Sequence, residues 1–425
     1  MKVVAIDNSE IDGSGPASSG ALESPVAIVL SPWLPTPHLP YAGSFVVDFV
    51  DYAGTIYPRG LTTIHIDDTF RSNRRFVDLV AARGLAARAV QQAGASAGVS
   101  SIHIPLPVRQ GSGWRDRVEA ARVVGKGLAR LPERLSQLGR GTLPAHIHAH
   151  VGGVTGSAVL PWLGDHDLFV YEHASFLFDL LGSDAKVKSR YREVFQHARR
   201  ITSVNPTMTR RLSEEFPEAA SRMSTHPNAL DFGRFVFKQR VAPLTNWLYV
   251  GNLKADKGLV RLLEAFNDVA SIWPDVELTI VGAGPDQALV EEMSTGNRVR
   301  LIPPVPPSQM PAVLSGADLL VHLSRGETFG MTALEAVASG VPVLVTSTDG
   351  SEYTLRPIIE TAGTIVPQSS DRATIVESYR ELREMPGRLD LLAAREDLRS
   401  RFSFEAAADR LGGLVAGASG PIGQR

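Results

Sequence analysis

The feature that most constrains this chain is a regular alternation of short apolar runs with longer stretches of helical composition, and it occurs twice along the 425 residues. The first series of apolar runs covers 26–30, 62–66, 101–104, 146–150, 168–171 and 200–204. The second covers 247–250, 276–281, 299–302, 319–322, 342–345 and 363–366. Strands that alternate with helices predict parallel sheets covered on both faces. We therefore expect an α/β protein with two doubly wound parallel sheets.

The break between the two series sets the predicted domains. A chain of this length is too long for one compact core, so two domains are the natural expectation. We predict an N-terminal domain over residues 26–240 and a C-terminal domain over 241–400, with a last helix and tail over 401–425 that crosses the interface. Residues 1–25 are rich in Ser, Gly and Ala and predict a flexible leader. In such sheets ligands bind beyond the carboxyl ends of the strands, which implies a central cleft.

Composition excludes several classes of function. The chain has no cysteine, so disulfides and thiolate metal sites are excluded, as fits a cytoplasmic protein. A net charge of -2 gives no reason to expect a nucleic-acid binder. The half up to Arg240 carries 27 Lys and Arg against 22 Asp and Glu, and the rest 16 against 23. That basic first half leaves peripheral membrane contact open, although no apolar run is long enough to span a bilayer.

One segment carries most of the chemistry, namely residues 324–340, which follow an apolar run and lead into a helix that we expect to end at Gly340. Two acids, Glu327 in the entering loop and Glu335 inside the helix, stand eight residues apart. Both carboxylates are therefore expected to point into the cleft from one helix end. The backbone amides at the start of this helix belong to Gly330, Met331 and Thr332, and free amides at a helix N-terminus suit a diphosphate.

This segment resembles the signature of glycosyltransferase family 4, whose retaining enzymes have the GT-B fold of two Rossmann-like domains facing a central cleft. The family has two acids at this separation with a Phe-Gly pair between them. The resemblance implies that Glu327 contacts the hydroxyls of the donor sugar and that Glu335 holds the nucleotide ribose. Phe329 is expected to be a packing residue that shapes the loop.

The loop after the first strand of the second domain supports the resemblance. The family has an Arg there and, five residues later, a Lys that together clamp the donor diphosphate. Lys257 matches the Lys, but Asn252 stands at the Arg position, which puts half of the cation pair in doubt. Lys254 is a possible substitute. A cation at this place would stabilise the charge of the departing diphosphate.

Glycines and histidines complete the predicted site. Gly282 and Gly284 resemble the family's tight turn after the next strand, and Gly43 resembles its glycine loop near the donor phosphate. On the acceptor side, the family's strand-end histidines correspond to His173, expected to contact sugar hydroxyls or the acceptor, and to His150. Glu172, beside His173, is a further acceptor-side candidate.

The resemblance implies a hexosyltransferase that moves a sugar from a nucleoside-diphosphate sugar, UDP favoured over GDP, to a hydroxyl of a saccharide, lipid or small molecule. No cofactor and no metal are expected, because the family generally needs none. The catalytic candidates are thus Glu327, His173 and Lys257. Two alternatives stay open, namely a nucleotide-sugar epimerase of the same two-domain fold and a sugar-binding protein without activity. The sequence does not name the sugar, the nucleotide, the acceptor or the oligomeric state.

Overall fold

The short apolar runs form the strands of two parallel sheets in a computed structural model of the chain. The structure describes residues 24–36, 39, 41–68, 75–92, 100–108, 112–239, 243–294 and 298–417. The chain divides into two compact units. The first contains the described parts of residues 1–34, 42–226 and 408–425, and the second those of 35–41 and 227–407. The leader predicted for residues 1–25 lies almost wholly outside the described residues.

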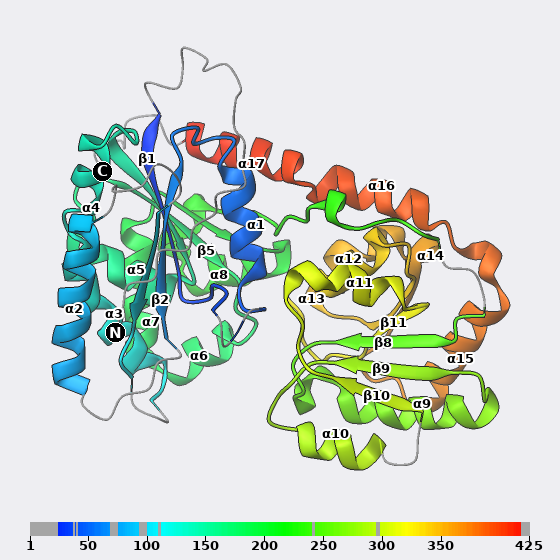
Figure 1. Cartoon of the computed structure of the whole chain (residues 1–425). Helices are drawn as coiled ribbons and strands as arrows, with labels where there is room; N and C mark the ends of the chain where they lie inside the picture. Colours follow the sequence, from blue (N-terminus) through cyan, green and yellow to red (C-terminus); the bar gives the residue numbers. More distant parts are fainter. Residues whose placement is uncertain are drawn as a thin grey trace. The chain divides into compact units, whose positions relative to one another are not determined.

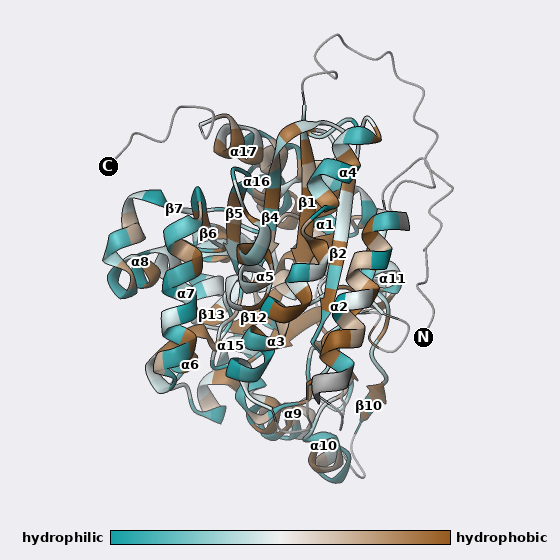
Figure 2. Cartoon of the chain, turned by 90° about the vertical axis from the view of Figure 1, so that its left-hand side faces the viewer, coloured by the Kyte–Doolittle hydropathy of each residue, from teal (hydrophilic) through white to brown (hydrophobic). Residues whose placement is uncertain are grey.

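Within the described residues, the sheet of the first unit has seven parallel strands in the order β3-β2-β1-β4-β5-β6-β7. Their bounds are β1 Pro25–Ser31, β2 Leu61–Asp67, β3 Ser100–Pro105, β4 Thr142–His150, β5 Asp167–Glu172, β6 Arg200–Ser203 and β7 Met223–Thr225. Strand β1 is buried along almost its whole length, and most of it has the hydrophobic colour in Figure 2. The strand order reverses between β1 and β4, which is where doubly wound sheets bind ligands.

The helices of the first unit are α1 Ser44–Ala53, α2 Arg75–Gln92, α3 Trp114–Gly125, α4 Leu131–Gln137, α5 Gly152–Val159, α6 Leu177–Ser183, α7 Ala185–His197, α8 Pro206–Glu215 and α17 Phe404–Ala416, of which the last begins in the second unit. Helices α2, α3, α5 and α7 pack side by side in that order (Figure 1). Helix α5 is buried on all sides, whereas α7 and α8 show long hydrophilic stretches in Figure 2. This difference is expected, because α5 lies between α3 and α7.

The second unit repeats the plan, with six parallel strands among its described residues in the order β10-β9-β8-β11-β12-β13. The strands are β8 Asn246–Val250, β9 Glu277–Val281, β10 Val299–Ile302, β11 Leu319–His322, β12 Val343–Thr346 and β13 Gly363–Val366. The helices are α9 Leu259–Ile272, α10 Gln287–Ser294, α11 Met310–Ser315, α12 Met331–Ala338, α13 Asp349–Thr354, α14 Ile359–Ala362, α15 Arg372–Glu384 and α16 Leu391–Phe402. Here the order reverses between β8 and β11.

In the second unit, aromatic side chains pack helices α9 and α15 against the sheet. The indole of Trp247 on β8 lies 5.9 Å from the ring of Phe266 on α9 and 4.9 Å from that of Tyr379 on α15. All three side chains are buried. Rings packed edge to face at this range stabilise a core beyond the area they bury. Helices α9 and α15 therefore cover the same face of the sheet (Figure 1).

Two details of the first unit do not follow from the sequence pattern. The helical region between β3 and β4 is interrupted, because it consists of α3, a 3-10 turn at Lys126–Leu128 and then α4. Pro132 stands in the first turn of α4, where a proline is tolerated, and it would break a continuous helix. Strand β7 was missed, because three half-buried residues at a sheet edge leave no apolar pattern. Among the described helices, none is long and apolar enough to cross a membrane.

Candidate active site

The first part of the signature segment, residues 324–330, forms a loop between β11 and α12. This signature loop ends at Gly330, whose backbone is left-handed. Gly330 has φ 82° and ψ 49°, and the helix begins at the next residue. A Cβ at Gly330 would meet no atom within 4 Å, so the backbone angle rather than crowding requires glycine here. No side chain caps this N-terminus. The first amides of α12 are thus available to an anionic ligand.

The structure brings together the two charged residues predicted to lie closest to the chemistry. The Nζ atom of Lys257 lies 2.6 Å from Oε1 of Glu327, and it lies 3.4 Å from the carbonyl oxygen of Gly326. The side chains of Lys257 and Glu327 are 22% and 25% exposed, so both can reach a bound molecule. When a ligand binds, the lysine of such an ion pair can contact a phosphate group instead, and the glutamate can contact hydroxyl groups.

Backbone contacts hold the two loops that carry this pair. The short turn η6, Ala255–Lys257, is followed by Gly258, which has φ 73°. A Cβ at Gly258 would lie 1.9 Å from the carbonyl oxygen of Leu323, so only glycine lets the two chains approach. The amide of Arg325 also donates to the carbonyl of Asp256 at 2.9 Å. Lys257 therefore faces Glu327 because β8 and β11 are neighbours in the sheet.

Glu335 lies on α12 just over one turn after its start, as predicted, and its side chain is half-buried. Met331 and Thr332 form the first turn of the same helix, so the structure gathers these three predicted donor-side residues at one helix end. Phe329 is buried, with its ring 5.2 Å from that of Phe402 on α16. This confirms its expected packing role.

His322, the last residue of β11, joins the site although the sequence analysis did not select it. Its ring stacks on Tyr249 at 5.2 Å with 8° between the planes, and Nδ1 lies 4.0 Å from Oε1 of Glu327. Burial lowers the pKa of His322, with the Lys257 charge acting in the same direction and the Glu327 charge against it. The uncharged ring therefore lies beside the Glu327 carboxylate without neutralising its charge. Only its position two residues before the signature segment could have indicated it.

The predicted diphosphate clamp is only partly assembled. The side chain of Asn252 is exposed, while its carbonyl accepts a hydrogen bond from the Tyr249 hydroxyl at 3.0 Å. Lys254 pairs with Asp256 at 3.0 Å, and it does not join Lys257. Of the three polar residues that we considered for the clamp, the structure brings only Lys257 to Glu327.

Gly282 and Gly284, in the turn after β9, were predicted to belong to the donor site. The structure gives a packing reason for both glycines. A Cβ at Gly282 would lie 2.0 Å from the carbonyl oxygen of Gly251, and one at Gly284 would lie 2.2 Å from that of Leu253. The space beside both glycines is therefore filled by the chain itself. At Gly284 the close approach that glycine allows is to the backbone of Leu253.

In the first unit, Gly43 precedes α1 with φ 64°, and a Cβ there would lie 1.9 Å from the carbonyl oxygen of Trp33. The half-buried ring of His173 follows β5, and its Nε2 lies 3.0 Å from Nδ1 of His150 on the neighbouring β4. The two imidazoles stack at 5.2 Å. The structure thus brings His150 and His173 together, but only His173 is accessible to a ligand.

The acceptor-side assignments of His150 and Glu172 need correction, because both side chains are in the core of the unit, at 1% and 0% exposure. One oxygen of Glu172 accepts a hydrogen bond from the Gly152 amide at 2.7 Å. Burial raises the pKa of the Glu172 carboxyl to about 8, against the effect of that amide, so the group is largely protonated at neutral pH. Burial, with the nearby His173, also lowers the pKa of His150 well below its usual value. Both residues are therefore structural: His150 contacts His173, and Glu172 holds the start of α5.

A row of aromatic rings beside His173 was not foreseen. The Phe45 ring lies 4.4 Å from that of His173, and the Trp33 ring lies 6.3 Å from Phe45 and 6.4 Å from Phe176. Trp114 continues the row, 5.1 Å from Phe176. Phe176 is 38% exposed, and the two tryptophans are half-buried. The row was missed because its members come from four separate segments of the chain.

Comparison with known proteins agrees with this geometry. Residues 243–401 match the family described as glycosyl transferases group 1. A D-inositol 3-phosphate glycosyltransferase of Segniliparus rotundus is 31% identical over 181 residues. That alignment spans 38% of this chain and 38% of the relative, so it covers well under two thirds of the relative's length.

Solved structures extend the likeness to nearly the whole chain. A sucrose-phosphate synthase from Thermosynechococcus elongatus superposes with a TM-score of 0.70 at 17% identity, over 93% of this chain and 99% of its own. The Anabaena protein HepE, solved in complex with UDP, superposes with a TM-score of 0.62 at 14% identity, over 92% of this chain and 100% of its own. At such identities the likeness concerns the fold. The chain has the GT-B fold, and its residues 243–401 match the glycosyl transferases group 1 family.

Proposed function

We propose that the protein is a retaining glycosyltransferase that moves a sugar from a UDP-sugar to a hydroxyl of a saccharide, lipid or small-molecule acceptor. The observation that carries the proposal is the 2.6 Å contact between Lys257 and Glu327, made where the uncapped α12 begins. Glu335 on the same helix adds a second carboxylate. A cation, free amides and two carboxylates are the groups that a nucleotide sugar requires.

The donor diphosphate would bind at the cationic and amide end of this group. Cleavage of the glycosidic bond leaves a nucleoside diphosphate, whose growing charge must be stabilised by fixed donors. Lys257 would release Glu327 and contact the phosphates, while the amides of Met331 and Thr332 would donate hydrogen bonds to the phosphate oxygens at the helix N-terminus. The UDP bound in the structurally similar HepE supports UDP as the nucleotide.

The transferred sugar would be oriented by Glu327 once Lys257 has turned to the phosphates. A carboxylate accepts hydrogen bonds from two neighbouring hydroxyls, which fixes a sugar ring against rotation. His322 would keep that carboxylate in place from the other side. Glu335, further along α12, would accept hydrogen bonds from the ribose hydroxyls.

The acceptor would bind at the first unit, beside His173. The row Phe45, Trp33 and Phe176 offers apolar faces next to this histidine, and pockets of this kind combine aromatic walls with a few polar groups. We propose that a hydroxyl of the acceptor reaches the sugar from the same face that the diphosphate leaves. The departing phosphate oxygen would take the acceptor proton, and retention would follow.

We expect turnover without a divalent metal, because Lys257 and the α12 amides would bear the charge that a metal carries in other transferases. The test is turnover in the presence of EDTA, compared with the same reaction supplied with Mg²⁺ or Mn²⁺. Loss of activity with EDTA and its return with metal would contradict this expectation.

The function is tested by incubating the protein with a panel of UDP-, GDP- and ADP-sugars, with and without candidate hydroxyl acceptors. Release of nucleoside diphosphate that requires the acceptor supports the transferase. Conversion of the donor alone into another nucleotide sugar would identify an epimerase instead. Binding of nucleotide sugars without turnover under any acceptor would leave only a sugar-binding protein. The anomeric configuration of the product, read by NMR, decides between retention and inversion.

A further inference from the structure

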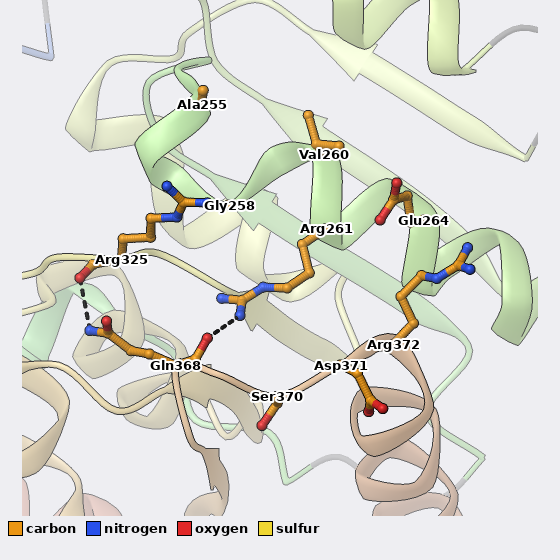
Figure 3. A pocket seen from close by; sticks show the side chains of 10 residues that line it. All are labelled: Ala255, Gly258, Val260, Arg261, Glu264, Arg325, Gln368, Ser370, Asp371 and Arg372. Atoms are coloured by element: carbon orange, nitrogen blue, oxygen red, sulfur yellow. Dashed lines mark hydrogen bonds between the residues drawn. The ribbon is translucent and has the colours of Figure 1, made fainter.

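A pocket lies beside the loop that carries Arg325, entirely within the second unit. It is a cavity of about 440 Å³ between the first turns of α9 and α15, and it is bordered by Arg325 of the signature loop (Figure 3). Neither Lys257 nor Glu327 lines it. The pocket is thus separate from the donor groups described above, although Gly258 and Arg325 connect it to the same two loops.

Two guanidinium groups occupy one end of this pocket. Arg261 donates hydrogen bonds to the carbonyl oxygens of Gln368 at 2.6 Å and Leu323 at 2.7 Å. Arg325 extends its side chain toward Gly258 on the same side of the cavity (Figure 3). Among the described residues, neither arginine forms an ion pair with a carboxylate. Two positive charges therefore share this end without an ion-pair partner, and burial, together with the charge of Arg325, lowers the pKa of Arg261.

The acidic groups of the pocket do not neutralise that end. Asp371 caps α15 by accepting from the Thr374 amide at 2.9 Å and from its hydroxyl at 2.7 Å. Glu264 stands one turn after Arg261 on α9, on the side of the cavity where Arg372 lies (Figure 3). The pocket accordingly has a cationic end at Arg261 and Arg325 and a carboxylate at the opposite end.

We propose that this pocket binds a small phosphate-bearing molecule, with its phosphate on Arg261 and Arg325. A phosphate monoester carries a charge of about -1.5 to -2 at neutral pH, which matches two unneutralised guanidinium groups. Guanidinium groups bind phosphate oxygens in pairs of parallel hydrogen bonds. Glu264, at the far end, accepts hydrogen bonds from hydroxyls of the same molecule. The cavity volume falls in the range of small-molecule sites.

Occupation of the pocket would act on the donor groups through the chain. Arg325 is two residues before Glu327, and Gly258 directly follows Lys257. A ligand on Arg325 would restrain the loop that holds the Glu327 carboxylate. This binding site goes beyond the proposed transfer reaction and does not depend on it.

The test is a calorimetric titration of the full chain with glycerol 3-phosphate, with inorganic phosphate and with glycerol. Glycerol 3-phosphate and inorganic phosphate are both expected to bind, whereas glycerol is not. The lower of the two dissociation constants shows whether the pocket prefers a phosphate monoester or free phosphate. Arg325→Gln should weaken binding at least about tenfold, since each charge-assisted pair is a strong contact. Arg325 is exposed, so its variant is expected to unfold at the wild-type urea midpoint.

Three further variants decide where the phosphate binds. Lys257→Ala removes the cation of the donor site, so phosphate binding that persists in this variant takes place outside the donor site. Glu264→Gln should strengthen binding about twofold to threefold, because it removes a negative charge from the pocket. Arg399→Gln, on α16 and 56% exposed, removes a positive charge outside the pocket and is the matched control. Binding that is lost in Lys257→Ala but kept in Arg325→Gln would overturn the proposal, as would no binding of either phosphate at millimolar concentration.

Discussion

The Nζ atom of Lys257 lies 2.6 Å from Oε1 of Glu327, across two loops that are 70 residues apart in the sequence. Each residue is predicted to contact a different part of the donor, Lys257 the diphosphate and Glu327 the sugar. Their contact keeps both charges satisfied in a partly exposed place. Donor binding would then exchange one ion pair for two sets of contacts at little electrostatic cost.

Glu327→Ala is expected to reduce turnover by about 10²-fold to 10³-fold while leaving the dissociation constant of UDP nearly unchanged, because its proposed partner is the sugar. Glu327→Gln should retain part of the activity, since the amide oxygen still accepts one hydrogen bond. Steady-state rates and UDP calorimetry measure the two effects. Wild-type turnover in Glu327→Ala would exclude the assigned role.

Glu335→Ala is expected to weaken UDP binding about tenfold or more, because two hydrogen bonds from ribose hydroxyls to a carboxylate would be lost. The measurement is the dissociation constant of UDP by calorimetry. Glu384→Ala, at the exposed end of α15, removes the same charge from the same unit and serves as control. Equal affinities in the two variants would contradict the ribose contact.

Two glycines of the donor site should differ in their cost of substitution. Gly330→Ala has room for its methyl group but must hold φ at 82°, which costs about 1–2 kcal/mol. Gly258→Ala adds a clash with the Leu323 carbonyl, so its loss of stability should exceed the first by roughly 2 kcal/mol. Urea unfolding measures both values. A smaller loss for Gly258→Ala than for Gly330→Ala would show that the two loops are not held by this contact.

Glu172 should make the stability of the chain depend on pH. Its pKa is raised to about 8 in the folded chain from an ordinary value of 4.5, so between these values the unfolded chain releases a proton that the folded chain keeps. The free energy of unfolding should therefore fall as the pH rises from 5 to 8, by at most about 1.4 kcal/mol per pH unit. Below the ordinary value this penalty is absent.

Glu172→Gln tests the origin of that slope, since glutamine keeps an acceptor for the Gly152 amide and carries no titrating proton. Urea midpoints of wild type and variant are compared at pH 5, 6, 7 and 8. In the variant, the free energy of unfolding is expected to fall much less between pH 5 and pH 8 than in the wild type. The same slope in both proteins would assign the pH dependence to other groups.

Trp33→Ala should raise the KM for the acceptor about fivefold to tenfold while the KM for the donor stays constant, because an aromatic contact contributes on the order of 1 kcal/mol. Phe178→Ala is the matched control. Its ring lies outside the row and is covered by the Arg211 guanidinium at 3.7 Å. A rise in donor KM, or an equal effect of both variants, would remove the aromatic row from the acceptor site.

Much of this site could be predicted from the sequence because its donor groups lie in one short segment. Glu327, Gly330 and Glu335 are neighbours along the chain, and local rules of helix starts place them at one helix end. His322, Trp33 and Phe176 escaped prediction because their importance depends on which side chains meet them. His150 and Glu172 were misjudged for the same reason, since burial against distant segments cannot be read from their neighbours in the sequence.

The sequence by itself determined the two series of strands and helices, because the alternation of buried runs and amphipathic stretches is a local pattern that parallel sheets require. It also determined the glycine at position 330, where one backbone angle decides the residue. Only the tertiary structure decided that Lys257 meets Glu327, through the pairing of β8 with β11. It likewise decided that His173 lies open while His150 is buried beneath it, since sheet order and helix packing set the exposure of each strand end.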